Sequence, residues 1–504
     1  MRAAASWTAR AAALLLLVLL LAVVVRLPWA GDLGIHAATI ERLRRDLLDP
    51  GDPLVAADAP SPYYTPWTLL LGCVAKVTGL GVFVVLRIAA LVSLAVLVTG
   101  VWSFVGTFLE SAAQEGAAQE GAARESAAGR WRRSAVVALV LLSLVLLWGT
   151  VLFRWSGFLG LDSLALTVSY PSSFALGASF WLWALLRRAT AWAHFLGAGI
   201  LWAVILLSHQ FTGVVASLGA AAMVLGARPW PGKAAWVRLG AGLVLGVALL
   251  AVWPYYSFFD LFGIGGLEEI HRSLYRDLPG RCWLVALVGG AALVLRWWRD
   301  RRDPLVLFCL FGAVLFAAGG LSGHWSWGRV LPAVLVPAQV AAGLEVFCAP
   351  RRAVRAGFGW VVAAALVLGA WTQSGVLGYV LPRSVLPSAI AAKYREPWAG
   401  YHWITPWVKY GDVVLAKKLP ARQIPAYGAY TVAPGYPDFF LGDEKARLAA
   451  VRTYFAAGTS RNRRTDVLRR YGVRWVVAYR GDGGLPLERV AVGPRGQILY
   501  RVWS

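Results

Sequence analysis

Long uninterrupted apolar runs fill most of the first 378 residues of this chain. A bilayer core of about 30 Å is crossed by roughly 20 apolar residues in a helix. Lipid offers no partner to backbone N–H and C=O groups, so such runs must be helical. Only 15% of the residues are charged, whereas soluble globular domains carry roughly 25%. The sequence therefore predicts an α-helical polytopic membrane protein with about eleven transmembrane helices. The expected spans are 11–30, 82–107, 134–153, 173–188, 190–208, 211–227, 237–254, 280–297, 304–320, 329–347 and 357–378.

The distribution of arginine predicts how these spans are oriented in a cell membrane. Cytoplasmic loops of membrane proteins are enriched in Lys and Arg. A cytoplasmic N-terminus puts the arginine-rich segments 130–133, 296–302 and 351–355 on the inner side. The short run 67–80 contains Lys76, and counting it as a span would reverse this pattern, so we expect a helix lying along the outer surface. The C-terminus is then extracytoplasmic.

Two domains are expected. Residues 1–378 form the transmembrane domain, which includes a first outer loop at 31–81 and a cytoplasmic linker at 108–133. Residues 379–504 form a small extracytoplasmic α/β domain. Its expected strands are 411–416, 473–479 and 498–503, and its expected helices are 443–456 and 462–471.

The C-terminal domain is strongly basic, with 20 Lys and Arg against 8 Asp and Glu in residues 379–504. A basic outer surface fits anionic lipid headgroups or an anionic cell-envelope polymer. Solvated surface charge is the alternative interpretation. Nucleic acid is not an expected partner on that side of a membrane.

Asp32 follows the first span directly, at the start of the first outer loop. His36 comes four residues later, so both residues share one face if the segment is helical. Residues 35–47 have the apolar and polar spacing of an amphipathic helix on the membrane surface. Asp32 is interpreted either as the N-cap of that helix or as a functional carboxylate.

The order of motifs in this loop favours the functional interpretation. Gly51-Asp52-Pro53 ends the amphipathic helix, and Tyr63-Tyr64-Thr65-Pro66-Trp67 precedes the surface helix. This order resembles the integral-membrane glycosyltransferases of the C-type (GT-C) superfamily, including lipid A aminoarabinose transferases and protein O-mannosyltransferases. The resemblance implies that Asp32 is the catalytic base and that the donor is a sugar linked to a polyprenyl phosphate. His36, Tyr63 and Tyr64 are then donor-binding candidates.

The sequence departs from that pattern at two positions. Many members carry a second acidic residue directly after the first, where this chain has Leu33. The aminoarabinose transferases carry a lysine before the proline of the Tyr/Pro stretch, where this chain has Thr65. Another basic group must then meet the donor phosphate. Arg329, close after His324, is the candidate, because a guanidinium can bond two phosphate oxygens at once. Interfacial anchoring is the alternative role for Arg329.

Two further residues are candidates for an acceptor site or a second acidic site. Asp162 lies in the second outer loop, and His209 lies at the outer end of a span. No cofactor is certain, and participation of a divalent metal stays open. Glu268, Glu269 and His271 are interpreted as a solvated helix face.

Three functions are compatible with these observations. The first is transfer of a sugar from a polyprenyl-phosphate donor to a cell-envelope acceptor, a polymer or a lipid, on the outer face. The second is a transporter or flippase of envelope lipid intermediates, and the third is a non-catalytic envelope scaffold. Transporters place polar groups near the bilayer midplane, whereas here the spans are nearly free of charge. The glycosyltransferase is therefore the preferred hypothesis.

Overall fold

A computed structural model describes residues 2–117, 127–263, 268–349 and 351–502 of the chain. Contacts divide it into two compact units. The helical unit contains Met1–Pro28, Ala90–Val252 and Gly265–Glu396. The loop–sheet unit contains Trp29–Ala89, Trp253–Ile264 and Pro397–Ser504.

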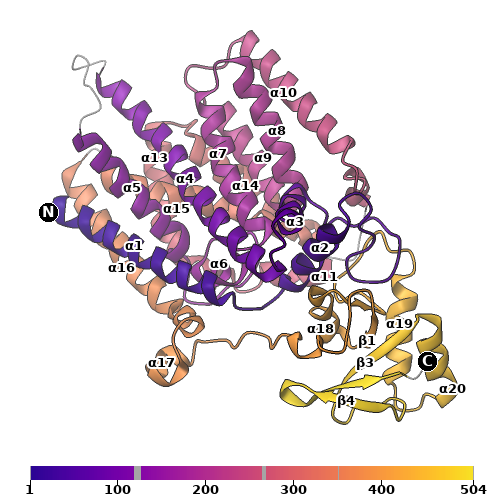
Figure 1. Cartoon of the computed structure of the whole chain (residues 1–504). Coiled ribbons are helices and arrows are strands. Elements are labelled where there is room, and N and C mark those ends of the chain that lie inside the picture. The colour runs from indigo at the N-terminus through magenta and orange to yellow at the C-terminus, as the bar shows by residue number, and fades with distance from the viewer. Residues whose placement is uncertain (1, 118–126, 264–267, 350, 503–504) are drawn as a thin grey trace. The chain divides into compact units, whose positions relative to one another are not determined.

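Each of the eleven apolar runs contains a helix (Figure 1). Seven of the helices in the described residues are long and apolar enough to cross a membrane, which confirms a multi-pass membrane protein. The expected linker is partly helical, because α4 continues to Ala117 and α5 begins at Ala127, while 118–126 lie outside the described residues. The eleven runs correspond to α1 (Arg2–Arg26), α4 (Val82–Ala117), α5 (Ala127–Leu146), α7 (Pro171–Arg188), α8 (Trp192–Ser208), α9 (Gln210–Leu225), α10 (Lys233–Ala251), α12 (Leu278–Leu284) with α13 (Gly290–Arg299), α14 (Pro304–Ser322), α15 (Pro332–Cys348) and α16 (Arg352–Thr372).

Small residues let these helices approach one another closely. A Cβ atom on Gly199 of α8 would lie only 1.9 Å from the carbonyl oxygen of Gly242 of α10. A Cβ atom on Gly177 of α7 would lie 2.8 Å from the backbone nitrogen of Leu97 of α4. Helix contacts in membranes depend on such close packing, because lipid tails are as apolar as the helices themselves.

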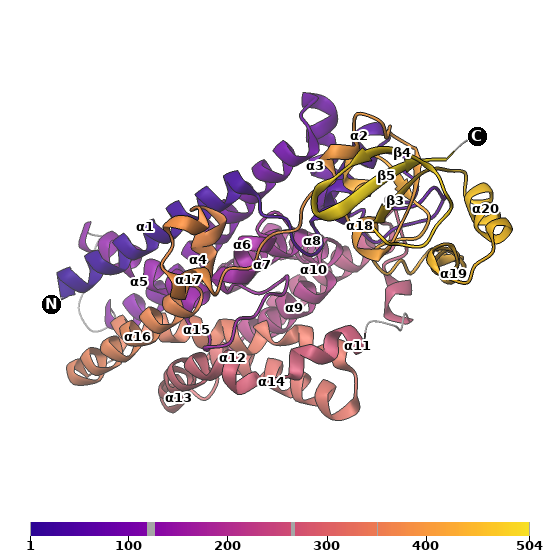
Figure 2. The same ribbon diagram turned by 90° about the horizontal axis from the view of Figure 1, so that it is seen from below.

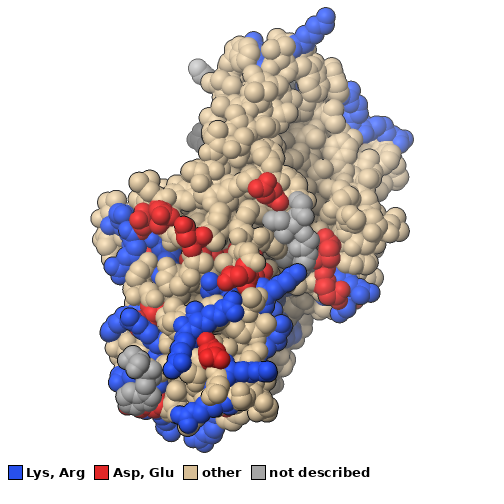
Figure 3. All heavy atoms as spheres, turned by 90° about the vertical axis from the view of Figure 1, so that its right-hand side faces the viewer, with Lys and Arg blue, Asp and Glu red and all other residues tan. Residues whose placement is uncertain are grey.

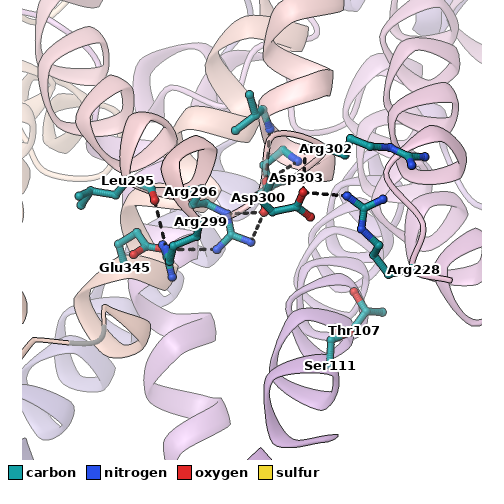
Figure 4. Close-up of polar contacts among 12 residues, drawn as sticks. Thr107, Ser111, Arg228, Leu295, Arg296, Arg299, Asp300, Arg302, Asp303 and Glu345 are labelled. Atoms are coloured by element: carbon teal, nitrogen blue, oxygen red, sulfur yellow. Dashed lines mark hydrogen bonds and ion pairs between the residues drawn. The ribbon is translucent and has the colours of Figure 1, made fainter. Parts of the chain in front are cut away.

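A group of buried and half-buried charged side chains in the helical unit forms ion pairs around Arg296 (Figure 4). Glu345, in the last turn of α15, is fully buried and contacts Arg296 at 3.1 Å and Arg299 at 2.5 Å. Arg296 also binds Asp303, at 2.7 Å. A buried charge is tolerated only when it is paired and hydrogen-bonded. These arginines belong to a segment that the arginine distribution predicts to be cytoplasmic.

The C-terminal part of the loop–sheet unit contains a five-stranded mixed sheet of order β2-β1-β3-β5-β4. Pairings β1–β2 and β1–β3 are parallel, and β3–β5 and β4–β5 are antiparallel. The three expected strands are present, and β2 and β4 were not expected. The strands are β1 (Val413–Ala416), β2 (Tyr430–Thr431), β3 (Val473–Tyr479), β4 (Glu488–Val492) and β5 (Gln497–Arg501). The small α/β domain expected after the spans is therefore confirmed.

Both faces of the sheet are covered (Figure 2). Helices α19 (Glu444–Phe455) and α20 (Arg461–Arg470) pack on one face, against side chains that include Leu415 and Val476. The segments around η7 (His402–Ile404) and η8 (Ile424–Tyr427) pack on the other face against Val414 and Val477. The short helix α18 (Lys418–Ala421) precedes η8. Alternate residues of β1 and β3 therefore face opposite layers, as the pleat of a strand requires.

The loop at residues 31–81 belongs to this same unit. It contains α2 (Leu33–Arg45) and α3 (Pro66–Thr78). Arg42 of α2 is fully buried, donates hydrogen bonds to the carbonyls of Gly428 (2.9 Å) and Ala429 (2.7 Å), and lies 3.6 Å from the ring centre of Tyr430. Thr431 of β2 donates its N–H to the carbonyl of Leu54 at 2.8 Å. Contacts thus group residues 29–89 with 397–504, whereas the expected domain boundary lay between 378 and 379.

Replacing Arg42 by Met should loosen this unit. The substitution keeps apolar bulk but removes two charge-assisted hydrogen bonds, a loss of about 3 kcal/mol. The buried carbonyl of Ala429 loses its Arg42 donor, whereas the carbonyl of Gly428 still accepts the N–H of Gly411 at 3.0 Å. Thermal unfolding and limited proteolysis of the purified protein measure the effect. Arg469→Met, an exposed arginine of α20, is the matched control. Equal stability of the two variants would contradict the role given to Arg42.

Candidate functional site

Asp32 occupies the N-cap position of α2, but its carboxylate makes no capping hydrogen bond to that helix. The backbone carbonyl of Asp32 accepts the N–H of His36 at 3.3 Å. Gly31 precedes it with a φ of 57°, a left-handed conformation that suits glycine. The simple capping interpretation of Asp32 therefore does not account for its side chain.

The C-terminal part of the unit packs directly on the first turn of α2. The hydroxyl of Tyr436 lies 2.9 Å from the carbonyl oxygen of Gly31 and 3.2 Å from that of Arg422. A Cβ atom on Gly34 would lie 1.8 Å from the carbonyl oxygen of Arg422. Only glycine allows this approach, and it places Arg422 beside the helix turn that follows Asp32.

The guanidinium of Arg422 is fixed through its Nε atom, and its two Nη atoms are left to bind other groups. Its Nε donates to the carbonyl of Gly435 at 3.0 Å, and its Cζ lies 5.0 Å from the ring centre of Tyr436. The side chain is half-buried. Within the described part of the chain, neither Nη atom has a hydrogen-bond partner. The geometry offers a fixed two-pronged donor.

Tyr63 connects this arginine to Asp32 electrostatically. Burial raises the pKa of the Tyr63 hydroxyl well above its usual value, and the charges of Asp32, Asp438 and Asp52 raise it further. The charge of Arg422 lowers it. Asp32 and Arg422 therefore both act on one hydroxyl, and the loop–sheet unit gathers these groups around it.

Asp52 and Asp438 form a buried pair of carboxyl groups. Asp52 accepts the N–H groups of Leu54 (2.7 Å) and Val55 (2.8 Å) through one oxygen, and both aspartates are at most 1% exposed. Burial, together with a hydrogen bond and repulsion from Asp52, raises the pKa of Asp438 to about 8. Two adjacent buried carboxylates cannot both ionise readily, so the pair shares a proton at neutral pH.

His36 and the tyrosine and threonine that follow Tyr63 have defined structural environments. Burial lowers the pKa of His36 to about 3, so the imidazole is neutral at physiological pH. The Tyr64 hydroxyl donates to the carbonyl of Gly51 at 2.7 Å. Thr65 caps α3 in a reciprocal box with Thr68. The position at which the aminoarabinose transferases carry a lysine therefore starts a helix in this chain.

A second set of candidates lies in the helical unit, around Asp162. Asp162, on the short helix α6 (Leu161–Thr167), forms an ion pair with Arg154. Its N–H donates to the side-chain oxygen of Gln373 at 3.2 Å. Burial raises the pKa of Asp162, whereas Arg154 and Arg395 oppose that rise.

Arg329, in η4 (Trp325–Val330), is deeply enclosed. One Nη donates to the carbonyl of Ser156 at 3.0 Å; the other lies 3.2 Å from the Ser156 hydroxyl and 3.4 Å from Nε2 of His209. The rings of Trp155 and Phe211 flank its Cζ at 5.4 and 4.8 Å. The structure thus brings the predicted residues Arg329 and His209 together.

His209 also starts α9, because its Nδ1 accepts the N–H of Thr212 at 3.2 Å. The other histidine predicted here, His324, packs edge-on against Trp327 at 5.3 Å. The binding roles of His209 and His324 stay predictions.

The prediction that residues 268–271 form a solvated helix face is wrong for His271. His271 is buried and packs against Trp155 (5.6 Å) and Phe211 (5.3 Å), the rings that flank Arg329. Glu268 accepts the N–H and the hydroxyl of Ser326, both at 2.7 Å. These contacts tie the segment to η4, which explains why it is not a free helix face.

The predicted site residues therefore fall into two groups, one in each unit. Asp32, His36, Tyr63 and Tyr64 belong to the loop–sheet unit; Asp162, His209, His324 and Arg329 belong to the helical unit. Sequence reasoning missed four neighbours of these residues, none of which lies in a recognisable motif: Arg154, Ser156, Arg422 and Asp438. In the described ranges, no cluster of three or more His, Cys, Asp or Glu side chains could hold a metal ion.

Comparisons with known proteins place this geometry in a structural class. No protein-family model matches the chain, and no curated protein matches it in sequence. The structure of the arabinofuranosyltransferase AftD from Mycobacteria matches over 98% of this chain, with a TM-score of 0.54 and 14% identity. The chain spans only 40% of that protein. A crystal structure of the Archaeoglobus fulgidus oligosaccharyltransferase matches with a TM-score of 0.41 and 13% identity.

The chain shares the fold of this membrane arabinofuranosyltransferase over nearly its whole length. The expected fold class is thereby confirmed. The roles of individual residues are not tested by a likeness at this level of identity and stay predictions.

The shared proton of the Asp52–Asp438 pair predicts a pH-dependent stability. The pKa of Asp438 is raised from an ordinary value of 3.8 to about 8 on folding. The folded state therefore binds more protons than the unfolded state between these values, and stability should fall as the pH rises from about 4 to about 8. In Asp438→Asn this slope should be reduced. Unfolding midpoints measured from pH 5 to 9 test it, with Asp466→Asn, at an exposed position of α20, as control. An unchanged slope in Asp438→Asn would rule out the shared proton.

Proposed function

We propose that this protein is a membrane glycosyltransferase that moves a sugar from a polyprenyl-phosphate donor to a hydroxyl group of a cell-envelope acceptor on the outer face. The GT-C fold and the likeness to an arabinofuranosyltransferase support glycosyl transfer. The observation that carries the proposal is the Asp32 carboxylate, which does not cap α2 and acts with Arg422 on the Tyr63 hydroxyl.

The proposed reaction is a direct displacement at the anomeric carbon. Asp32 accepts the proton of the acceptor hydroxyl while its oxygen forms the new glycosidic bond. The bond between the anomeric carbon and the phosphate oxygen breaks, and the polyprenyl phosphate leaves with the electron pair. Phosphate is a fair leaving group, so the protein contributes mainly orientation and neutralisation of charge.

Arg422 is proposed to neutralise that phosphate. Arg329, in the helical unit, stays the candidate that the sequence predicts, although both of its Nη atoms contact Ser156. Arg422 has both Nη atoms open and is held by its Nε bond to Gly435. A planar guanidinium with two open donors matches two phosphate oxygens. His36 is neutral and can supply a hydrogen bond but no positive charge.

Asp162 and His209 are proposed for the acceptor side or as a second acidic site. The ion pair with Arg154 must open, or be shared, for Asp162 to reach an acceptor hydroxyl or a metal. Lys and Arg side chains gather over the C-terminal α/β part of the chain (Figure 3), which suits an anionic polymer or lipid acceptor. The N-terminus is proposed to be cytoplasmic and the C-terminal part extracytoplasmic.

The contacts in the structure support a transporter or a scaffold less than they support an enzyme. A transporter would place charged groups near the middle of its spans, whereas Glu345 lies in the last turn of α15 and is paired there. A scaffold would not require the charge of Asp32. Both alternatives are therefore separated from the enzyme by a substitution at this position.

Asp32→Asn should abolish transfer while the protein still folds. The amide keeps the size of the side chain but cannot accept the acceptor proton, and loss of a general base costs about 100- to 10,000-fold in rate. Single-turnover transfer and thermal unfolding should be measured together. Asp58→Asn, at an exposed position of the same loop, controls for loss of one negative charge. Near-normal turnover in Asp32→Asn would eliminate Asp32 as the base.

The donor class can be tested by direct competition. Purified protein with a cell-envelope acceptor extract should transfer sugar from polyprenyl phosphates and not from nucleotide sugars. Arg422→Ala and Arg329→Ala should each weaken donor use roughly 10- to 100-fold, the loss expected for hydrogen bonds to a charged group, and lysine at either position should restore it in part. Arg463→Ala on α20, which removes an exposed charge, should have little effect. Transfer from nucleotide sugars alone would refute the proposal.

A further inference from the structure

The loop–sheet unit contains a cavity that lies apart from the groups assigned to catalysis. Its volume is about 320 Å³, and three segments build it: the last turns of α2, the first residues of α4, and residues 405–427. The cavity is lined by Glu41, Arg44, Arg45, Phe83, Lys409 and Tyr427, among others. We call it the basic cavity.

The charge of the lining is positive. Arg44 contacts Glu41 at 2.7 Å, and Arg45 contacts the same carboxylate oxygen at 3.5 Å. Lys409 uses one donor on the carbonyl of Pro406, at 2.9 Å. One carboxylate therefore faces three cations. Because like charges repel, an anion in the cavity would relieve an unfavourable interaction that the protein does not neutralise itself.

The arginines also retain unused donors. The Nε of Arg44 is buried and has no hydrogen-bond partner among the described residues. Arg45 is 54% exposed and its Cζ lies 4.7 Å from the ring centre of Tyr410, which fixes the direction of its guanidinium. Buried donors in proteins are nearly always paired. The unpaired Nε therefore calls for an acceptor oxygen inside the cavity.

The position of the cavity along the chain identifies the depth at which it meets the bilayer. Val82 and Phe83 line it, and Val82 is the first residue of α4, one of the membrane-spanning helices. The end of a span lies at the level of the lipid headgroups. This conclusion holds for either orientation of the protein in the membrane.

We infer that the basic cavity binds the anionic headgroup of a membrane phospholipid. The phosphate would accept hydrogen bonds from Arg44, Arg45 and Lys409, and the start of the acyl chains would lie along Val82 and Phe83. The size fits a small-molecule site, since such sites usually enclose about 300 to 1,000 Å³. A phospholipid there would fix the C-terminal end of α2, the helix that begins beside Asp32. The inference does not depend on the proposed glycosyl transfer.

Lipid binding to the full-length protein in neutral detergent provides the test. Phosphatidylglycerol and phosphatidylcholine of equal chain length are titrated, with thermal stabilisation and native mass spectrometry as readouts. Wild type should prefer phosphatidylglycerol. Basic residues near an anionic lipid surface each contribute about 5-fold in affinity, so Arg45→Gln with Lys409→Gln should weaken phosphatidylglycerol binding by roughly 25-fold and leave phosphatidylcholine unaffected.

The matched control removes the same charge from the same unit. Arg463→Gln with Arg469→Gln, two exposed residues of α20, should bind phosphatidylglycerol as wild type does. Equal losses in the two double variants would overturn the inference in favour of diffuse attraction to the basic surface. Displacement of phosphatidylglycerol by a soluble anionic polysaccharide, but not by inorganic phosphate, would overturn it in favour of a polymer site. Arg45→Lys with Lys409→Arg, which keeps the charge, should bind as wild type does if the cavity remains folded.

Discussion

The buried guanidinium of Arg42 is the interaction on which the loop–sheet unit depends. It is enclosed by the carbonyls of Gly428 and Ala429 and by the rings of Tyr410 and Tyr430. A buried cation is costly unless it is hydrogen-bonded or lies against aromatic rings, and both Nη atoms of Arg42 have carbonyl partners. The chain therefore has few alternative ways to arrange α2 on the C-terminal sheet. Asp32 lies directly before α2, so the position of the candidate base follows from a contact three helical turns away.

The proton shared by Asp52 and Asp438 affects the charge around the Tyr63 hydroxyl. Asp32, Asp52 and Asp438 all act on that hydroxyl. If all three were ionised, their negative charges would repel one another. The Asp52–Asp438 pair holds one proton, which lowers the local negative charge. The charge of Arg422 lowers it further.

The sequence predicts features that depend on local pattern and fails where distant segments meet. The eleven apolar runs are helices, and α2, α3, α19 and α20 begin and end close to the expected residues, because their amphipathic spacing and capping residues are local. The two-residue strand β2 has no periodicity to detect. Arg422 and Asp438 lie about 400 residues from the loop they contact and resemble ordinary surface residues of a basic domain. The charged neighbours of His271 predict a solvent-exposed side chain, whereas the rings of Trp155 and Phe211 pack against it.

The comparison of Arg329 with Arg422 shows why residue type alone does not identify a phosphate ligand. Arg329 has the favoured position at the end of a span, but its Nη atoms are used to hold the loop at Ser156. Arg422 lies in a soluble-looking segment, and its Nη atoms are open because Nε and the Tyr436 ring hold it. Thr65 stands where the aminoarabinose transferases carry a lysine, and it caps α3. A charge lost from the first outer loop can therefore be supplied from the C-terminal segment, provided that glycine at position 34 lets that segment approach the start of α2. Packing between the loop and the sheet would then determine where the donor phosphate binds.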